Sequence, residues 1–110
     1  ARKLAAYCEY FGVRTAWHAP RDTSPIGHAA NAHLDLAVPN FGIQERIVFG
    51  DVVEEVFPGC PKIRNGMMYV NEAPGLGIDI NEKLAAKYPL PGDPGNFGPK
   101  RRREGGIVEN

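Results

Sequence analysis

Apolar residues recur at helical spacing at the start of the chain and then give way to a short strand-like run. Leu4, Cys8 and Phe11 lie three or four residues apart, as expected for one face of a helix. Gly12 follows at the place where a glycine commonly ends a helix. Residues 13–17 are rich in β-branched and aromatic side chains, so they predict a strand.

A second helix and a second strand follow. Ser24 is a typical N-cap, and Pro25 suits the first helical position because no backbone N–H is needed there. Residues 26–38 are rich in alanine and leucine, which favour a helix, and Pro39 ends it. Residues 41–45 predict a strand with an acidic end. Helices that alternate with strands predict an α/β fold with a parallel sheet.

The second half of the chain predicts short elements set by local signals. They are a short helix, a hairpin, a tight turn and a last short helix, at residues 51–57, 62–70, 74–77 and 81–88. Asn65-Gly66 is the hairpin signal, and Asn81 is the expected cap of the last helix. Prolines and glycines dominate residues 89–99, so that stretch is expected to dock onto another surface or to remain mobile.

Composition narrows the class of protein without pointing to a macromolecular partner. The 110 residues allow one domain at most, and 13 basic side chains balance 13 acidic ones. A nucleic-acid-binding protein usually carries a basic surplus, so the basic run at residues 100–103 is expected to be solvated or paired with a neighbouring surface. No apolar run approaches the roughly 20 residues that span a bilayer, and no secretory signal is recognised. We expect neither a nucleic acid nor a membrane as partner.

The spacing of cysteines and histidines argues against a metal site in this chain. Cys8 and Cys60 are far apart, and Cys8 is expected to be a free buried thiol, which fits a cytoplasmic location. His28 and His33 are about 140° apart around a helix, so they cannot chelate one metal ion. We expect His28 to be solvated and His33 to pack in the core or at a helix interface. Asp35 is expected on the helix surface or in packing.

Polar side chains follow both strands of the predicted parallel sheet. His18 ends the first strand, Asp22 lies four residues further on, and Glu45 ends the second strand. The carboxyl ends of parallel strands share one edge, so these side chains are expected to face one another where β/α barrels carry their active sites. The residues alone leave a structural interpretation open, in which His18 is capped by a carbonyl, Asp22 stabilises a turn and Glu45 is solvated.

Two longer stretches carry a family resemblance. HAPRDTSPIGHAANAHLDLAVPNFGIQE, residues 18–45, closely resembles the mannonate dehydratase subgroup of the enolase superfamily. NEAPGLGIDINEKLAAKYP, residues 71–89, matches the carboxyl-terminal region of the same family. The resemblance implies an α+β capping domain and a modified (β/α) barrel. Residues 1–48 are then expected to be the last two barrel strands with their helices. Residues 49–110 are expected to be a mostly irregular segment with a small hairpin, packed back toward the capping domain.

The length of the chain makes it a part of such an enzyme. A (β/α) barrel takes about 250 residues, and the first helix starts at Ala1 without a cap, so we expect a carboxyl-terminal fragment. The resemblance implies a Mg²⁺-dependent dehydration of D-mannonate or D-gluconate to a 2-keto-3-deoxy sugar acid, in which Mg²⁺ stabilises charge that develops on the carboxylate. The metal ligands and the acid/base Tyr and His are expected upstream, so the isolated chain is expected to be inactive.

The resemblance assigns substrate contacts, and no catalytic residue, to this chain. His18, Asp22 and Glu45 match a histidine, an aspartate and a glutamate that bind substrate in the family. Phe97 stands where the family often has a pocket-lining tryptophan, so it is a further substrate contact that can stack but has no indole N–H. Ala19 stands where the family often has glycine, a change expected to reshape the loop.

Two other classes of function remain open. One is a non-catalytic relative that kept the barrel end for binding or regulation. The other is a standalone interaction module, which is disfavoured because two parallel strands and a long irregular tail bury little surface. The family resemblance adds the expectation that the parent protein is a homo-oligomer with a sugar-acid substrate.

Overall fold

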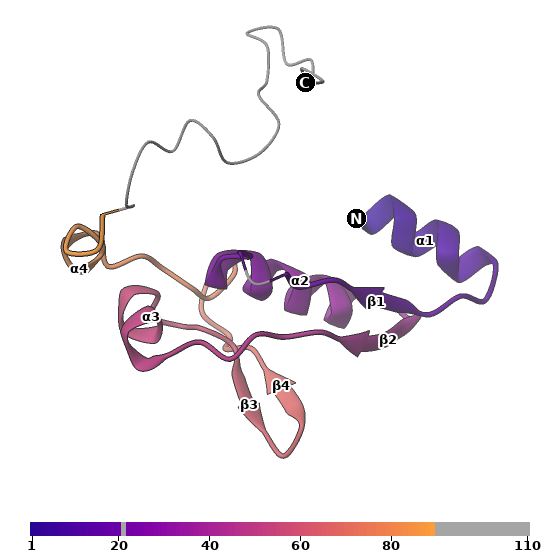
Figure 1. Cartoon of the computed structure of the whole chain (residues 1–110). Coiled ribbons are helices and arrows are strands. Elements are labelled where there is room, and N and C mark those ends of the chain that lie inside the picture. Colours follow the sequence, from indigo (N-terminus) through magenta and orange to yellow (C-terminus); the bar gives the residue numbers. More distant parts are fainter. Residues whose placement is uncertain (21, 90–110) are drawn as a thin grey trace, which may run out of the picture.

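The computed structural model describes residues 1–20 and 22–89, and Figure 1 shows their arrangement. In this part of the chain, helices and strands alternate as predicted. The elements are α1 (Arg2–Tyr10), β1 (Thr15–Trp17), α2 (Pro25–Ala37), β2 (Phe41–Gln44), α3 (Asp51–Val56), β3 (Lys62–Arg64), β4 (Met67–Tyr69) and α4 (Glu82–Ala85). Within the described ranges, every helix is too short or too polar to cross a membrane.

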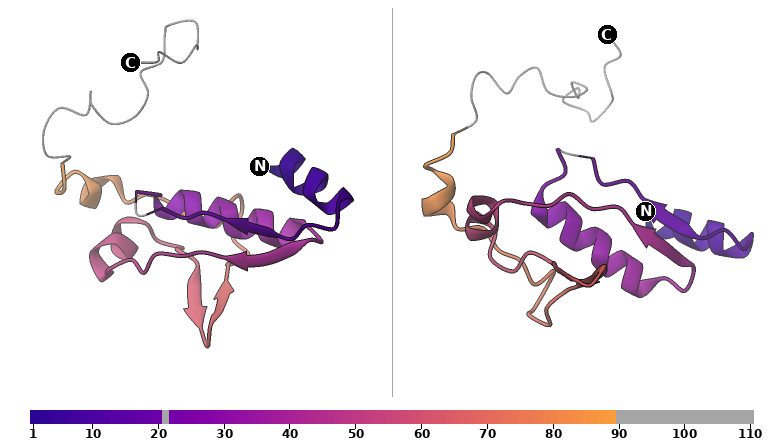
Figure 2. Two further views of the ribbon diagram at one scale, coloured as in Figure 1. Left: turned by 45° about the vertical axis from the view of Figure 1, so that its right-hand side comes forward. Right: turned by 60° about the horizontal axis from the view of Figure 1, so that its bottom comes forward.

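One of the two sheets in the described residues is the pair formed by β1 and β2. The two strands run parallel, with Thr15 opposite Phe41 and Trp17 opposite Gln44, and both arrows point the same way in Figure 1. The helix between them, α2, lies alongside the pair in both views of Figure 2. The expected order of strand, helix and parallel strand is therefore confirmed.

The start of α2 follows from two residues. The Ser24 side chain accepts a hydrogen bond of 3.2 Å from the backbone N–H of Gly27, and Pro25 occupies the first helical position. These are the capping and first-turn roles that serine and proline favour. The helix ends at Ala37, and Val38 is already extended. The prediction for this helix is confirmed to within one residue at each end.

The buried face of α2 differs from the expected one. His28 is only 1% exposed, although the sequence predicts a solvated histidine. The reason is that positions 28, 32 and 35 recur on one helix face, and Ala32 and Asp35 on that face are buried as well. The His28 ring packs edge-on against Phe49, with 5.1 Å between the ring centres. His33 is half-buried, and its Nε2 lies 3.1 Å from the carbonyl oxygen of Leu76. It therefore contacts a turn, rather than packing in the core or against another helix as expected.

Helix α1 ends as predicted but does not bury its apolar stripe. Gly12 has a positive φ of 67°, and the amides of Gly12 and Val13 bond to the carbonyls of Glu9 and Cys8. This is the glycine-dependent stop that the sequence predicts. Within residues 1–20 and 22–89, however, the stripe stays open, because Leu4 and Phe11 are 54% and 61% exposed. Cys8 is a free thiol but is half-buried rather than buried.

The hairpin and the last helix follow their local signals. Asn65 and Gly66 both have positive φ, 50° and 74°, as a two-residue hairpin turn requires. They join β3 and β4, which pair antiparallel and project away from the parallel pair in Figure 1. The Asn81 side chain caps α4 by accepting from the N–H of Leu84. The hairpin and the cap are confirmed, while the last helix ends at Ala85, three residues before the expected end.

The Asn40 side chain forms hydrogen bonds at the amino-terminal end of the β1–β2 pair. The Asn40 amide donates to the carbonyl oxygens of Ala5 and Val13, at 3.0 and 2.9 Å. The backbone carbonyl of Asn40 also accepts the N–H of Thr15, at 2.8 Å. These bonds tie α1, β1 and β2 together at the amino-terminal end of the strands, the end opposite His18 and Glu45.

Gly42 allows the two strands to approach closely, which gives a test of their packing. A Cβ at Gly42 would lie 2.6 Å from the backbone oxygen of Thr15, so β1 and β2 would have to separate. We expect Gly42→Ala to lower the free energy of unfolding by about 1–3 kcal/mol, measured by denaturant unfolding. Gly50→Ala is the matched control, because a Cβ there meets no atom within 4 Å. An equal loss of stability in the two variants would contradict this packing.

Candidate functional site

The carboxyl ends of β1 and β2 bring two predicted site residues together. The ladder ends with Trp17 opposite Gln44, and His18 and Glu45 are the next residues of their strands. The His18 Nε2 atom lies 3.5 Å from the Glu45 Oε2 atom. The same carboxylate oxygen accepts a hydrogen bond of 2.9 Å from the backbone N–H of Ala19. The expectation that His18 and Glu45 face one another is confirmed.

Both side chains remain open to a ligand. The His18 side chain is 75% exposed and the Glu45 side chain is 55% exposed. They border a hollow of about 380 Å³ at the end of the strand pair. Its lining residues are Ala16, Trp17, His18, Ile43, Gln44 and Glu45. The pair therefore offers an imidazole and a carboxylate, held by the sheet, to the hydroxyl groups of a polar molecule.

The two other predicted contacts are not brought to this pair. Asp22 is exposed and forms no hydrogen bond or ion pair with residues 1–20 or 23–89. It lies within the turn that is closed by the hydrogen bond from the Thr23 N–H to the Pro20 carbonyl. Phe97 lies outside the described residues. The roles of Asp22 and Phe97 stay predictions.

Ala19 fits its position without strain. The residue is 3% exposed. Its φ is not positive, since among the described non-glycine residues only Asn65 has a positive φ, so its backbone does not require glycine. The alanine methyl is buried while the amide N–H bonds to Glu45. The expected reshaping of the loop, relative to family members with glycine at this position, stays a prediction.

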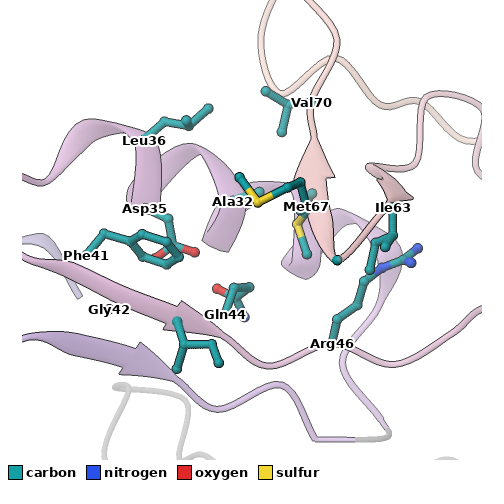
Figure 3. Close-up of a pocket in the computed structure, with 13 residues that line it drawn as sticks. Ala32, Asp35, Leu36, Phe41, Gly42, Gln44, Arg46, Ile63, Met67 and Val70 are labelled. Carbon is teal, nitrogen blue, oxygen red and sulfur yellow. The ribbon is translucent and has the colours of Figure 1, made fainter.

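A second hollow lies on the α2 side of β2. It has a volume of about 390 Å³ and is bordered by α2, β2 and the β3–β4 hairpin. In Figure 3, Leu36, Phe41, Ile63 and Met67 surround it. The lining is mostly apolar, and its charged or amide-bearing members are Asp35, Gln44 and Arg46.

Asp35 is the acidic residue in the lining of this second hollow. The residue is 8% exposed, and neither carboxylate oxygen has a hydrogen-bond partner among the described residues. Burial raises the pKa of Asp35 to about 6, and the nearby Trp17 indole offsets part of that rise. The indole is close enough to act on the pKa, although its N–H does not reach hydrogen-bond geometry. A carboxyl group in this setting holds its proton more tightly than an exposed one.

The described residues do not form a metal centre. No group of three or more His, Cys, Asp or Glu side chains within residues 1–20 and 22–89 is placed to hold an ion. His28 is buried against Phe49. Burial lowers the pKa of His28, the Arg46 charge lowers it further, and the Glu45 charge acts in the opposite direction. The His18 imidazole and the Glu45 carboxylate can both form directed hydrogen bonds with hydroxyl groups. Chemically, this pair suits a ligand that carries several hydroxyls.

Comparison with known proteins places this geometry in a family. Residues 1–84 match the enolase C-terminal domain-like family. The chain belongs to this family. The D-galactonate dehydratase family member RspA of Pantoea ananatis is 63% identical over 92 residues, which cover 84% of this chain and 22% of that protein. The family member SEN1436 of Salmonella enteritidis is 62% identical over 92 residues, with the same coverage. The chain thus spans about a fifth of the length of these relatives.

Solved structures agree with the family assignment. The crystal structure of an enolase from Pantoea ananatis with bound D-gluconate and Mg has a TM-score of 0.79 and 63% identity, covering 83% of this chain and 22% of that one. A mandelate racemase/muconate lactonizing enzyme from Jannaschia sp. CCS1 has a TM-score of 0.74 and 33% identity, covering 83% and 23%. The enolase-superfamily resemblance is confirmed. The relatives carry the D-galactonate dehydratase family name, so the mannonate subgroup stays a hypothesis.

Sequence reasoning missed one residue beside the site. The Gln44 side chain donates to the backbone carbonyls of Trp17 and Glu45, although the sequence patterns single out only its neighbour Glu45. The sequence feature that could have indicated Gln44 is its position directly before Glu45, the acidic residue at the strand end. A polar residue there can bond to carbonyls that the ending ladder leaves without partners.

The buried carboxyl group of Asp35 predicts a pH dependence of stability. Its folded-state pKa of about 6 lies above the ordinary value of about 3.9, so the folded state binds the proton more tightly. Stability from this group is present below about pH 4 and is lost as the pH rises through about 6. We expect Asp35→Asn to reduce the fall in melting temperature between about pH 4 and pH 7.

The matched control for this prediction is Asp51→Asn, since Asp51 is exposed in the first turn of α3. The control should keep the pH profile of the unmutated protein. If Asp35→Asn has the same profile as well, the carboxyl group of Asp35 is not buried in the protein in solution.

Proposed function

We propose that this chain is the carboxyl-terminal part of a Mg²⁺-dependent sugar-acid dehydratase. The proposed substrates are D-mannonate or D-gluconate, and the product is a 2-keto-3-deoxy sugar acid. The observation that carries the proposal is the His18–Glu45 pair at the shared end of two parallel strands. It gains support from 63% identity to an enolase that was crystallised with D-gluconate and Mg.

Glu45 is proposed to accept hydrogen bonds from sugar hydroxyls. Its Oε2 atom is already held by the Ala19 N–H and lies near His18. The Oε1 atom has no hydrogen bond to a described residue, and the side chain is 55% exposed. A carboxylate anchored through one oxygen presents the other in a fixed direction, which is what orienting a flexible sugar chain requires.

His18 is proposed to bind a neighbouring hydroxyl. An imidazole has one donor and one acceptor nitrogen in its neutral form, so it can either donate a hydrogen bond to a sugar hydroxyl or accept one from it. Asp22 and Phe97 are proposed as further substrate contacts, by hydrogen bonding and by stacking respectively. Together these groups position the substrate, while removal of the proton and loss of water belong to residues outside the described ranges.

The same proposal covers the rest of the protein. Residues 1–48 are proposed to be the last two strands of a (β/α) barrel with their helices, and residues 49–110 a segment that packs toward a capping domain. The Mg²⁺ ligands are proposed to lie in the preceding part of the protein, as the family resemblance implies. A cytoplasmic homo-oligomer is the proposed setting.

The proposed role of Glu45 can be tested in the complete protein. We expect Glu45→Gln to raise the KM for D-gluconate or D-mannonate by about 10- to 100-fold, because hydrogen bonds to a charged group contribute about 1.5–3 kcal/mol. Steady-state kinetics of 2-keto-3-deoxy acid formation measures this. Glu72→Gln, at an exposed position, is the control and should leave KM unchanged. An unchanged KM in Glu45→Gln would remove Glu45 from the site.

The proposed separation of substrate contacts in this chain from metal ligands elsewhere in the protein predicts a second result. The complete protein should lose turnover on treatment with a chelator and regain it with Mg²⁺. The isolated chain of residues 1–110 should show no dehydratase activity at any Mg²⁺ concentration, since its described residues offer no metal centre. Product formation by the isolated chain would contradict the proposal. A complete protein that binds D-gluconate with Mg²⁺ but never turns it over would instead be the non-catalytic relative.

A further inference from the structure

The Gln44 side chain bridges the two strand ends that carry the proposed substrate contacts. Its Nε2 atom donates to the carbonyl oxygen of Trp17, at 3.4 Å, and to the carbonyl oxygen of Glu45, at 2.6 Å. Trp17 is the residue directly before His18. One amide group is therefore bonded to the backbone on both sides of the gap that separates His18 from Glu45.

This bridge lies where the backbone ladder stops. The last paired residues are Trp17 and Gln44, so beyond them the two strands have no further rung of the sheet. Carbonyl groups at such an end need another donor, and the Gln44 amide supplies it. The opposite amide orientation would aim the Gln44 oxygen at two carbonyl oxygens, so the hydrogen bonds themselves fix the orientation of the amide.

Gln44 and Glu45 hold the end of β1 from two sides. The Gln44 amide is bonded to the carbonyl of Trp17, and the Glu45 carboxylate accepts the N–H of Ala19. His18 stands between these two attachment points. Its distance from the Glu45 carboxylate, 3.5 Å, is thus set by bonds on either side of it in the chain.

We propose that Gln44 is a positioning residue that sets the separation of His18 and Glu45 for sugar-acid binding. The proposal rests on the proposed function, which it deepens by adding a residue that acts through the two contacts rather than on the substrate. Loss of the amide frees the end of β1, so the substrate has to reorder the pair when it binds. The consequence is weaker binding with little change in the chemical step.

The chain contains a matched control at the other end of the same strands. The Asn40 amide also donates to two backbone carbonyls, those of Ala5 and Val13. Its side-chain oxygen, like that of Gln44, is buried without a partner among the described residues. Removing either amide removes the same kind and number of hydrogen bonds, but only Gln44 lies beside His18 and Glu45.

The experiment compares Gln44→Met and Asn40→Leu in the complete protein. Each replacement keeps roughly the size of the side chain and removes the amide. Three quantities are measured: the melting temperature, the KM and kcat for D-gluconate or D-mannonate with Mg²⁺, and the hydrogen-exchange rate of the Ala19 amide. Gln44→Glu, which keeps length and polarity but replaces the donor by an acceptor, serves if Gln44→Met does not fold.

Both variants should melt at a lower temperature. Gln44→Met should raise KM about 10-fold, with kcat within about twofold, and should speed exchange of the Ala19 amide. Asn40→Leu should change neither KM nor that exchange rate. The proposal is overturned if Gln44→Met lowers the melting temperature but leaves KM and the exchange rate of the Ala19 amide unchanged. That result would show that Gln44 has a structural role alone.

Failure of the proposed function has a different signature. In that case the unmutated protein turns over no sugar acid, whereas Ala19 exchange still reports on the strand ends. Faster exchange in Gln44→Met but not in Asn40→Leu then supports positioning of the His18–Glu45 pair. Equal exchange in both variants rejects it.

Discussion

The parallel pairing of β1 and β2 is the constraint on which the candidate site depends. A parallel pair ends with both carboxyl ends at one edge of the sheet, so Trp17 and Gln44, which are 27 positions apart in sequence, become neighbours there. His18 and Glu45 leave that edge together and approach to 3.5 Å. Without the pairing, the two side chains would have no fixed relation to each other.

Much of this arrangement could be predicted from local signals. Ser24 and Pro25 mark the start of α2, Asn65-Gly66 marks the hairpin, and the helix–strand alternation marks the parallel pair. Each signal acts within a few residues, through a cap, a turn or a backbone preference. The juxtaposition of His18 and Glu45 could also be predicted, because adjacent parallel strands end at the same edge of the sheet. The same prediction was wrong for Asp22, which lies beyond the strand in a turn.

Features that depend on packing between distant segments could not be predicted in this way. The burial of His28 depends on Phe49, and the tie between the strand ends depends on which carbonyls the Gln44 amide meets. The exposed stripe of α1, with Leu4 54% exposed, has no packing partner within residues 1–20 and 22–89. This chain spans about a fifth of the length of its relatives. We propose that the preceding part of the protein covers the exposed apolar stripe of α1.

A crystal structure of the complete protein with D-gluconate and Mg²⁺ would test the proposed site most directly. We expect sugar hydroxyls within hydrogen-bond distance, about 2.7–3.2 Å, of the His18 imidazole and the Glu45 carboxylate. We also expect the metal ion to be held by residues outside this chain's described ranges. A sugar acid bound away from the ends of β1 and β2 would rule out His18 and Glu45 as substrate contacts.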